Sequence, residues 1–275
     1  MILDTLAAAA RARIDKLEKV KNLAAVRAEA EQIHKQAATD GRRISASGAK
    51  SFLVNLQRPG LNFICECKKA SPSKGLISPK FPYLDIAKAY ERGGASAVSV
   101  LTEPEYFLGS DLYLQEIAAQ INLPVLRKDF TVSPYQIYEA KTLGASSVLL
   151  ICAILSASQL EEYRLEAESI GLDVLVETHD GQEIETALKS GARIIGINNR
   201  NLKDFTVDIR TCLQLRKEIP QDRVCIAESG IRNEDDIRSL KSKGFNGVLI
   251  GETLMRSGNP EEMLRKLISV SLREA

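Results

Sequence analysis

The chain has 275 residues, 44% of them hydrophobic, which is enough to bury a large core as one barrel or as two smaller domains. Its 37 Lys and Arg residues nearly balance 36 Asp and Glu residues, and the formal net charge is +1. A charge this close to zero provides no chain-wide attraction for nucleic acid or for an anionic membrane. We therefore expect neither as a partner, and the composition does not indicate an oligomer.

The five cysteines lie at positions 65, 67, 152, 212 and 225, mostly inside apolar runs. An odd, scattered set of this kind is typical of reduced thiols in a cytosolic protein. Cys65 and Cys67 lack the two-residue spacer of a zinc knuckle, and the two histidines, His34 and His179, do not cluster with cysteines. We expect the cysteines to fill apolar space, and we predict no metal site.

The apolar stretches of the chain do not resemble export or membrane segments. Charged residues follow the first of them, 6–10, at once, which is not the order of charges in a signal peptide. The longest uncharged apolar run, 148–155, is far shorter than the ~18 residues that span a bilayer. These features predict a soluble, cytoplasmic protein.

The first part of the chain carries a helical pattern. From residue 6 to about residue 57, apolar positions recur three or four residues apart between charges, with breaks near Asn22 and at Asp40-Gly41. The pattern changes after Pro59-Gly60. We expect residues 1–60 to form a helical extension that packs on the rest of the chain, where it caps a rim or covers an opening.

Short apolar runs then alternate with amphipathic segments. The runs predict eight strands, at 63–67, 97–101, 124–126, 147–151, 173–176, 194–197, 224–227 and 247–250. The stretches between them predict helices, for example 83–92, 134–143, 157–170, 182–189 and 234–243. Glycines at 93–94, 144, 171, 191 and 244 stand where a helix would end in a left-handed cap.

This rhythm predicts an α/β fold. Strands buried on both faces, with helices between them, are typical of an all-parallel sheet. Eight such units within residues 61–275 match a single closed (β/α)8 TIM barrel, with a doubly wound open sheet as the alternative. The barrel is favoured because polar residues gather at the carboxyl ends of the strands, and in a barrel those ends meet at one mouth.

The first strand ends in an unusual charge pattern. Side chains on a strand alternate between its faces, so Glu66 and Lys68 share one face while Cys65 and Cys67 share the other. Unpaired burial of either charge is costly, so this pattern is typical of a strand that ends at an active site. Reading every strand to its end gives a candidate catalytic set: Glu66, Lys68, Lys128, Glu177, Asn198 and Ser229.

The alternation also predicts which neighbours these residues have. Lys128 shares its face with Leu126, Glu177 with Leu175, Asn198 with Gly196 and Ser229 with Ala227, whereas Lys69, Arg127 and Asp129 point toward the helices or the surface. Each residue alone has a structural explanation, such as a solvated lysine or a turn-forming asparagine. Their number favours a shared cavity. His179 lies on the same face, but with Asp180 it fits the start of a helix.

Two loops indicate a phosphate site. Ser229-Gly230 and Gly251-Glu252 follow the seventh and eighth strands, where phosphate-binding barrels present backbone N–H groups to the anion. The first loop, 71–75, adds hydroxyl and N–H donors. The carboxylate of Glu252 would repel a phosphate unless it points away, and a plain turn is the alternative for each glycine.

Ordered motifs make the chain similar to the indole-3-glycerol phosphate synthase family. They are ECKKASPSKG at 66–75, SVLTE at 99–103, YFLGS at 106–110, LRKDF at 126–130, YQIYEA at 135–140, GINNRNL at 196–202, AESGI at 227–231 and GETLM at 251–255. The resemblance runs from about Phe52 to Arg256 and is looser in the N-terminal helices.

The resemblance implies an activity in tryptophan biosynthesis. The family converts 1-(2-carboxyphenylamino)-1-deoxyribulose 5-phosphate to indole-3-glycerol phosphate, carbon dioxide and water, without cofactor or metal. By this resemblance Lys128 is a general acid for the ribulose carbonyl, Glu177 and Glu66 serve later proton transfers, and Lys68 holds the anthranilate carboxylate. How the Lys128/Glu177 and Lys68/Glu66 pairs divide the acid and base roles stays open.

The family pattern also implies the remaining contacts. Substrate would be bound by Asn198 and by Ser71, Phe107, Phe130, Leu149, Arg200 and Glu228, and its phosphate by Gly230, Gly251 and Glu252, with Ser229 nearby. Three other functions remain: a phosphosugar-binding barrel that has lost catalysis, a Schiff-base aldolase using Lys68 or Lys128, and a related phosphosugar isomerase. Loss of a charged strand-end residue would favour the first of these, and none is lost.

Overall fold

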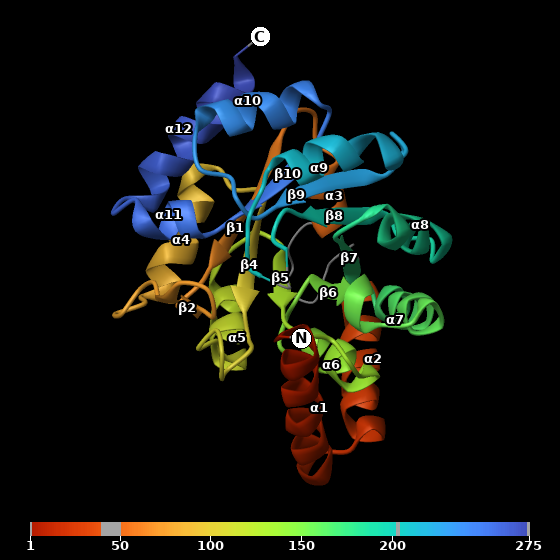
Figure 1. The fold of residues 1–275 in the computed structure, drawn as a ribbon. Coiled ribbons are helices and arrows are strands. Elements are labelled where there is room, and N and C mark those ends of the chain that lie inside the picture. Colours follow the sequence, from red (N-terminus) through yellow and green to blue (C-terminus); the bar gives the residue numbers. More distant parts are fainter. Residues whose placement is uncertain (1, 40–50, 202–203, 274–275) are drawn as a thin grey trace.

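The computed structural model describes residues 2–39, 51–201 and 204–273, and a closed barrel of eight parallel strands forms its centre (Figure 1). The barrel strands are β1 (Asn62–Cys67), β4 (Ala97–Leu101), β5 (Val125–Lys128), β6 (Ser147–Ile151), β7 (Asp173–Thr178), β8 (Ile194–Asn198), β9 (Val224–Glu228) and β10 (Gly247–Ile250). They pair in chain order, and β10 closes the barrel against β1. The predicted TIM barrel is confirmed, with every strand end within two residues of its expected place, and the open sheet is wrong.

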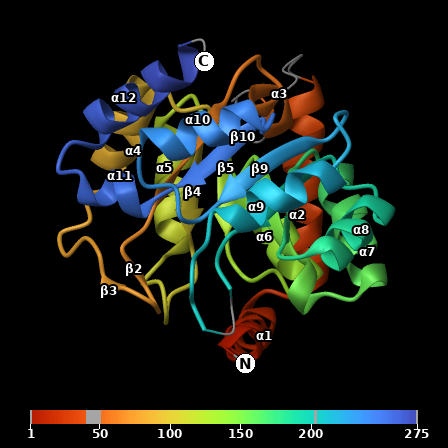
Figure 2. The same cartoon turned by 45° about the horizontal axis from the view of Figure 1, so that its top comes forward.

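Helices surround the barrel (Figure 2). Those that follow the strands are α4 (Tyr83–Gly93), α5 (Asp111–Gln120), α6 (Pro134–Thr142), α7 (Ala157–Ser169), α8 (Gly181–Lys189), α9 (Arg210–Leu215), α10 (Glu234–Ser242), α11 (Glu252–Arg256) and α12 (Pro260–Leu272). Single 3₁₀ turns lie at Cys152–Ile154 and Arg216–Glu218, and β2 (Ala70–Ser71) pairs with β3 (Gly75–Leu76) in the first loop. The five helices predicted by residue range are confirmed.

Local sequence sets where these helices begin and end. Ser156 and Asn233 each form a capping box, with Gln159 and Asp236 at the third helical position, and so satisfy backbone donors that the helix leaves free. Glycines 94, 144, 171, 191 and 244 have φ angles between 74° and 95°. They adopt the left-handed conformation that ends a helix, as their positions predict.

The barrel strands bury two apolar layers. Inward-facing residues fill the barrel interior, and they include Ile64, Leu126, Leu149, Leu175, Ile226 and Leu249. Residues of the opposite parity pack between the strands and the helices. Cys65 and Cys67 belong to this outer layer and are buried, so their predicted role as apolar filler is confirmed. Among the described helices, no segment has both the length and the apolar character needed to cross a bilayer.

The N-terminal segment forms α1 (Ile2–Val20), α2 (Leu23–Thr39) and α3 (Phe52–Leu56). The predicted break near Asn22 is confirmed, whereas Asp40-Gly41 falls outside the described residues. Helix α2 packs along α6 on the flank of the barrel, and α1 also contacts α6 (Figure 1). These helices precede all eight barrel strands, which lie between Asn62 and Ile250.

The N-terminal helices reach both ends of the barrel. Leu3 and Leu6 of α1 are buried in the inner apolar layer with Phe130, which lies just beyond the carboxyl end of β5. At the opposite end, Asn55 Nδ2 of α3 donates to the Ser96 carbonyl at 2.8 Å, just before β4 begins. Residues of α1 thus lie at the mouth of the barrel, whereas α3 contacts the opposite end, which the sequence did not indicate.

Candidate functional site

A cavity of about 490 Å³ opens at the carboxyl ends of the barrel strands. Every site residue predicted from the sequence lines this one cavity: Glu66, Lys68, Ser71, Phe107, Lys128, Phe130, Leu149, Glu177, Asn198, Arg200, Glu228, Ser229, Gly230, Gly251 and Glu252. Strand polarity explains the convergence, because parallel strands in a closed barrel all direct their carboxyl ends to the same side.

Lys128 stands at the end of β5, with its side chain 17% exposed. Its Nζ atom lies 3.4 Å from Glu177 Oε2 and 4.0 Å from Glu228 Oε2. Burial lowers the pKa of Lys128, but Glu177, Glu228 and Glu66 raise it by more, so the net pKa lies above the ordinary value. Lys128 is therefore a protonated ammonium at neutral pH. The sequence alone left open whether its pKa is raised or lowered.

The two carboxylates that face Lys128 have opposite properties. Burial raises the pKa of Glu177, but Lys128, the imidazole of His179 and the amide of Asn198 outweigh burial and hold the pKa well below its usual range. Burial and the negative charge of Glu177 raise the pKa of Glu228, and Lys128 offsets only part of this. Neighbouring carboxyl groups with separated pKa values are able to take different acid and base roles.

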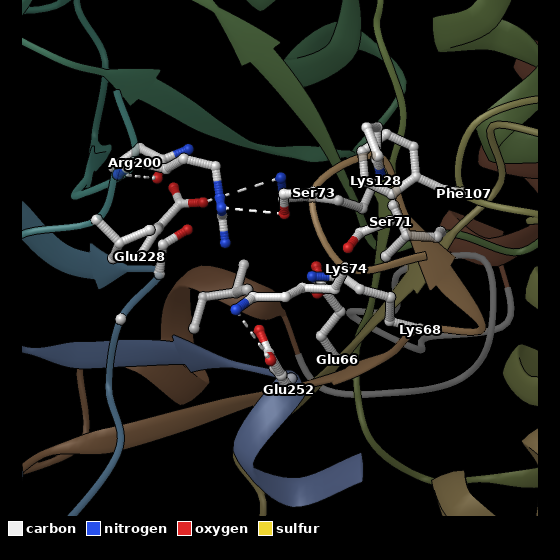
Figure 3. Close-up of a pocket in the computed structure, with 18 of the residues that line it drawn as sticks. Glu66, Lys68, Ser71, Ser73, Lys74, Phe107, Lys128, Arg200, Glu228 and Glu252 are labelled. Atoms are coloured by element: carbon white, nitrogen blue, oxygen red, sulfur yellow. Dashed lines mark hydrogen bonds and ion pairs between the residues drawn. The ribbon is translucent and has the colours of Figure 1, made fainter. Parts of the chain in front are cut away.

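A second ion pair lies on β1. Lys68 Nζ contacts Glu66 Oε1, and Glu66 is buried. Figure 3 places both side chains across the cavity from Arg200, on the same side as Lys74 and Glu252. The alternation read from the sequence is thus right for β1, since Glu66 and Lys68 both line the cavity.

The predicted facing of β9 is wrong. Ala227 lies in the outer apolar layer, and Glu228 is the residue that points inward with Ile226. The strand continues to Glu228, and Ser229 then has a φ of 64°, which turns the chain and brings Ser229 to the mouth. The carboxylate of Glu228 has room because residue 196 is a glycine, whose added Cβ would overlap Glu228 Oε1.

Arg200 links two loops across the mouth (Figure 3). Its Nη1 atom donates to Ser73 Oγ at 3.1 Å and to the Phe205 carbonyl at 3.3 Å. Its backbone N–H donates to Asn198 Oδ1 at 3.0 Å, so the side chain of Asn198 is fixed from the same loop. These bonds hold the guanidinium at the cavity edge, where it is able to meet an anionic or hydroxyl group.

At two positions of the mouth, a residue larger than glycine would clash or adopt a strained backbone. An added Cβ at Gly251 would lie 2.7 Å from Glu66 Oε1, and Gly230 has a φ of 79°. The carboxylate of Glu252 lies 3.9 Å from Lys74 Nζ and 3.2 Å from Arg256 Nε. Two cations thus face the Glu252 charge that the sequence singled out as unfavourable for a phosphate.

One wall of the cavity is apolar. The rings of Phe107 and Phe130 lie 6.2 Å apart between centroids, and Leu149 lines the cavity from β6. Leu3 and Leu6 of α1 add to this wall, together with Ile2. The sequence left open whether the N-terminal segment caps a rim or covers the mouth, and it did not single out these residues, because a helical repeat alone does not say which surface it meets.

Several polar residues near the mouth were missed or misplaced. Arg232 and Arg256 line the cavity, and each follows a mouth glycine by a few residues, a signal that the sequence contains. Asp129, predicted to point toward the helices or the surface, also lines the cavity. Asp180 accepts from the Glu183 N–H and caps α8, as predicted, but His179 lies 3.4 Å from Glu177.

Arg127 lies among the helices, as its parity predicts. It is buried, and its Nη2 atom lies 2.9 Å from Asp111 and 2.7 Å from Glu139. Across the part of the chain that the structure describes, no group of three or more His, Cys, Asp or Glu side chains is arranged to hold a metal ion.

Sequence comparison gives a consistent family. The family model described as indole-3-glycerol phosphate synthase matches residues 3–267. A curated indole-3-glycerol phosphate synthase of Ruminiclostridium cellulolyticum is 50% identical over 267 residues, which cover 97% of this chain and 98% of that protein. The curated synthase of Endomicrobium trichonymphae is 49% identical, with coverage of 97% and 99%.

Solved structures with low sequence identity share the fold. KGPDC from Streptococcus mutans aligns with a TM-score of 0.60 at 12% identity, over 77% of this chain and 97% of that chain. An archaeal fructose-1,6-bisphosphate aldolase aligns with the same TM-score at 14% identity, over 80% and 97%. The family match spans nearly all of the chain, including every strand that supplies the cavity, and the chain therefore belongs to the indole-3-glycerol phosphate synthase family.

Proposed function

We propose that the cavity converts 1-(2-carboxyphenylamino)-1-deoxyribulose 5-phosphate to indole-3-glycerol phosphate, carbon dioxide and water, with Lys128 as the acid of the ring-closing step. The observation that carries this proposal is the ammonium of Lys128 within 4.0 Å of two buried carboxylates whose pKa values are shifted in opposite directions. The family match and the curated synthases at about 50% identity support the same activity.

Ring closure needs a cation at the ketone. The aromatic carbon that bears the carboxylate attacks the ribulose carbonyl carbon, and the carbonyl π electrons move to oxygen. An aromatic carbon is a poor nucleophile, so the developing alkoxide charge must be stabilised as it forms. The ammonium of Lys128 supplies that charge and donates its proton to the oxygen. General acid catalysis of this kind contributes about 10²–10⁴-fold.

The apolar wall of the cavity favours the loss of carbon dioxide, which is the second step. The carbon–carboxylate bond breaks, and its electron pair restores the aromatic ring. A carboxylate that moves from water into an apolar surrounding loses carbon dioxide more readily. Phe107, Phe130 and Leu149 would supply that surrounding, while Lys68 holds the carboxylate before it leaves.

Dehydration then requires an acid and a base. The hydroxyl formed at ring closure leaves as water after it takes a proton, and a carboxylate removes a proton from the ring system. Glu177 is suited to act as the base because Lys128, His179 and Asn198 keep its carboxylate ionised. Glu66 and Lys68 are the second pair able to move these protons, and Glu228, with its raised pKa, is suited to a hydrogen bond with a substrate hydroxyl.

The rest of the substrate is assigned to the loops. Backbone N–H groups near Gly230 and Gly251 would bind the phosphate, together with the N–H of Glu252 at the first position of α11, which has no acceptor within its helix. Ser71 and Ser229 would add polar contacts, and Arg200 and Asn198 would bind the sugar hydroxyls.

A fluorescence assay tests the proposal. Purified protein, without added metal or cofactor, is expected to convert the carboxyphenylamino-deoxyribulose phosphate to a fluorescent indole product. Lys128→Met is expected to lower kcat by at least about 100-fold with little change in KM, because the variant removes an acid that acts in the transition state. Lys243→Met, an exposed lysine outside the cavity, is the matched control.

The alternatives give different results. Tight binding of the substrate without turnover would favour a barrel that has lost catalysis. Borohydride trapping of substrate on Lys68 or Lys128 would favour a Schiff-base aldolase. Turnover without release of carbon dioxide would favour an isomerase.

A further inference from the structure

His179 contacts a cavity carboxylate without lining the cavity itself. It directly follows β7, and its side chain is 16% exposed. Its Nε2 atom lies 3.4 Å from Glu177 Oε1, and its Nδ1 atom lies 3.0 Å from Glu183 Oε2. Among the described residues, Nε2 has no hydrogen bond of good geometry, so its contact with Glu177 is an ion pair rather than a directed bond.

The start of α8 holds the imidazole in place. Glu183 Oε2 accepts both the Nδ1 contact and the backbone N–H of His179, the latter at 2.8 Å. Glu183 is fixed in turn, because its own backbone N–H donates to the Asp180 cap at 2.9 Å. The ring is therefore anchored on a helix before any substrate binds, which is what a group that orients another residue requires.

The charges around His179 favour its protonated form. Burial lowers its pKa, but Glu177 and Glu183 outweigh burial and raise the pKa of His179 to about 10. The other titratable groups close to this cluster are Lys128, Glu228, Asp180 and Cys152, and burial raises the pKa of the half-buried Cys152 thiol. His179 is thus an imidazolium across the neutral range, next to a carboxylate that must stay ionised.

The two oxygens of Glu177 have different partners. Oε1 faces His179, and Oε2 faces Lys128. We propose that His179 is a positioning residue, which fixes Glu177 as a carboxylate with one oxygen aimed at Lys128. Without this cation, Glu177 would depend on Lys128, whose ammonium also lies 4.0 Å from Glu228 Oε2, while Lys68 pairs with Glu66. The inference rests on the proposed role of Glu177 in proton transfer.

Ring NMR tests the charge on His179 without any turnover. The chain contains two histidines, so an untagged protein gives two sets of imidazole signals, and His34→Gln assigns them. His179 is expected to stay doubly protonated at pH 8, whereas burial and Lys141 lower the pKa of His34, which titrates below its usual range. Glu183→Gln is expected to move the His179 titration to lower pH. A neutral His179 ring at pH 7 would overturn the proposal.

Kinetics test whether that charge acts through Glu177. His179→Gln is expected to lower kcat by about 10-fold, to leave KM within about twofold, and to move the acidic limb of the kcat profile up by about one pH unit, because Glu177 loses a neighbouring cation. His34→Gln, the matched control on α2, is expected to keep the wild-type profile. Wild-type kcat and an unmoved acidic limb in a folded His179→Gln protein would overturn the proposal.

The two readouts separate this inference from the proposal on which it rests. If Glu177→Gln keeps near-wild-type turnover while the NMR titration is as expected, the role of Glu177 fails and the charge state of His179 stands. If Glu177→Gln is impaired but His179→Gln is not, the positioning role alone fails. Should His179→Gln not fold, the wild-type and Glu183→Gln titrations, with the kcat profile of Glu183→Gln, decide the outcome.

Discussion

Arg13 of α1 donates to Asp129 Oδ2 at 2.6 Å, and Asp129 is the residue directly after Lys128. The same oxygen accepts from Thr102 Oγ1 at 2.8 Å, and Asp129 Oδ1 accepts from the N–H of Phe130. An N-terminal helix thus contacts the chain directly after β5, between the proposed acid Lys128 and the ring of Phe130 in the apolar wall. Asp129 is buried, where a charge is costly, and Arg13 offsets that charge together with Arg127, whose Nη2 atom lies 3.6 Å from the same oxygen.

Arg13→Gln is expected to raise KM several-fold and to lower the free energy of unfolding by about 1–3 kcal/mol, because it leaves a buried carboxylate without this cation. Arg11→Gln, an exposed arginine of the same helix, is the matched control. Kinetics and thermal melting of both variants check the expectation. Equal KM and equal melting temperature for both would mean that α1 only covers the mouth and does not position the β5 turn.

Glu177→Gln is expected to lower kcat by at least about 100-fold with a much smaller change in KM. The amide cannot accept a proton, and it no longer carries the charge that offsets Lys128. Steady-state kinetics at several pH values, beside the surface control Glu185→Gln, measure the effect. A change confined to KM would assign Glu177 to substrate binding instead.

Gly196→Ala is expected to displace Glu228, because the new Cβ would overlap Oε1 of that side chain and lie 3.3 Å from Leu175 Cδ1. We expect at least about a 10-fold loss of kcat/KM, with a destabilisation of about 1–3 kcal/mol from overpacking. In a Glu228→Ala background the clash disappears, so Gly196→Ala is expected to cost little more activity. Additive losses in the double variant would show that residue 196 acts by another route.

The strand positions and most of the mouth are predictable from sequence because both depend on local periodicity. Apolar runs mark the strands, and the two-residue alternation aims Lys128, Glu177 and Asn198 correctly. The same rule fails at Ser229, where a φ of 64° ends the alternation. The alternation does not assign Glu228 to the site, and only the family resemblance includes it.

Contacts between distant residues are not predictable in this way. Arg13 and Asp129 are 116 positions apart, and nothing in either local pattern names the other. The charge states also need distances: three glutamates raise the pKa of Lys128 and burial lowers it, and the sequence cannot say which effect is larger. The sequence predicts that His179 lies at a helix start, and it does. Its contact with Glu177 depends on how β7 and α8 are placed relative to each other, which no local pattern gives.

Glu228→Gln is expected to stabilise the protein more at pH 8 than at pH 5. Glu228 has a higher pKa when folded than its ordinary value of 4.5, so above pH 4.5 the folded state binds more protons at this site than the unfolded state. Stability then falls as pH rises, and a permanently neutral amide escapes this loss. Each kcal/mol corresponds to roughly 2–4 °C at this chain length, so we expect an advantage of a few degrees at pH 8.

Melting curves of wild type, Glu228→Gln and the surface control Glu185→Gln at both pH values test this expectation. The control is expected to show the same difference from wild type at pH 5 and pH 8, since the pKa of Glu185 is lowered and its carboxylate is ionised throughout this range. A Glu228→Gln advantage that does not grow with pH would mean that Glu228 is ionised in the folded protein. Lys128 would then face two carboxylates, and Glu228 would not be suited to donate a hydrogen bond to substrate.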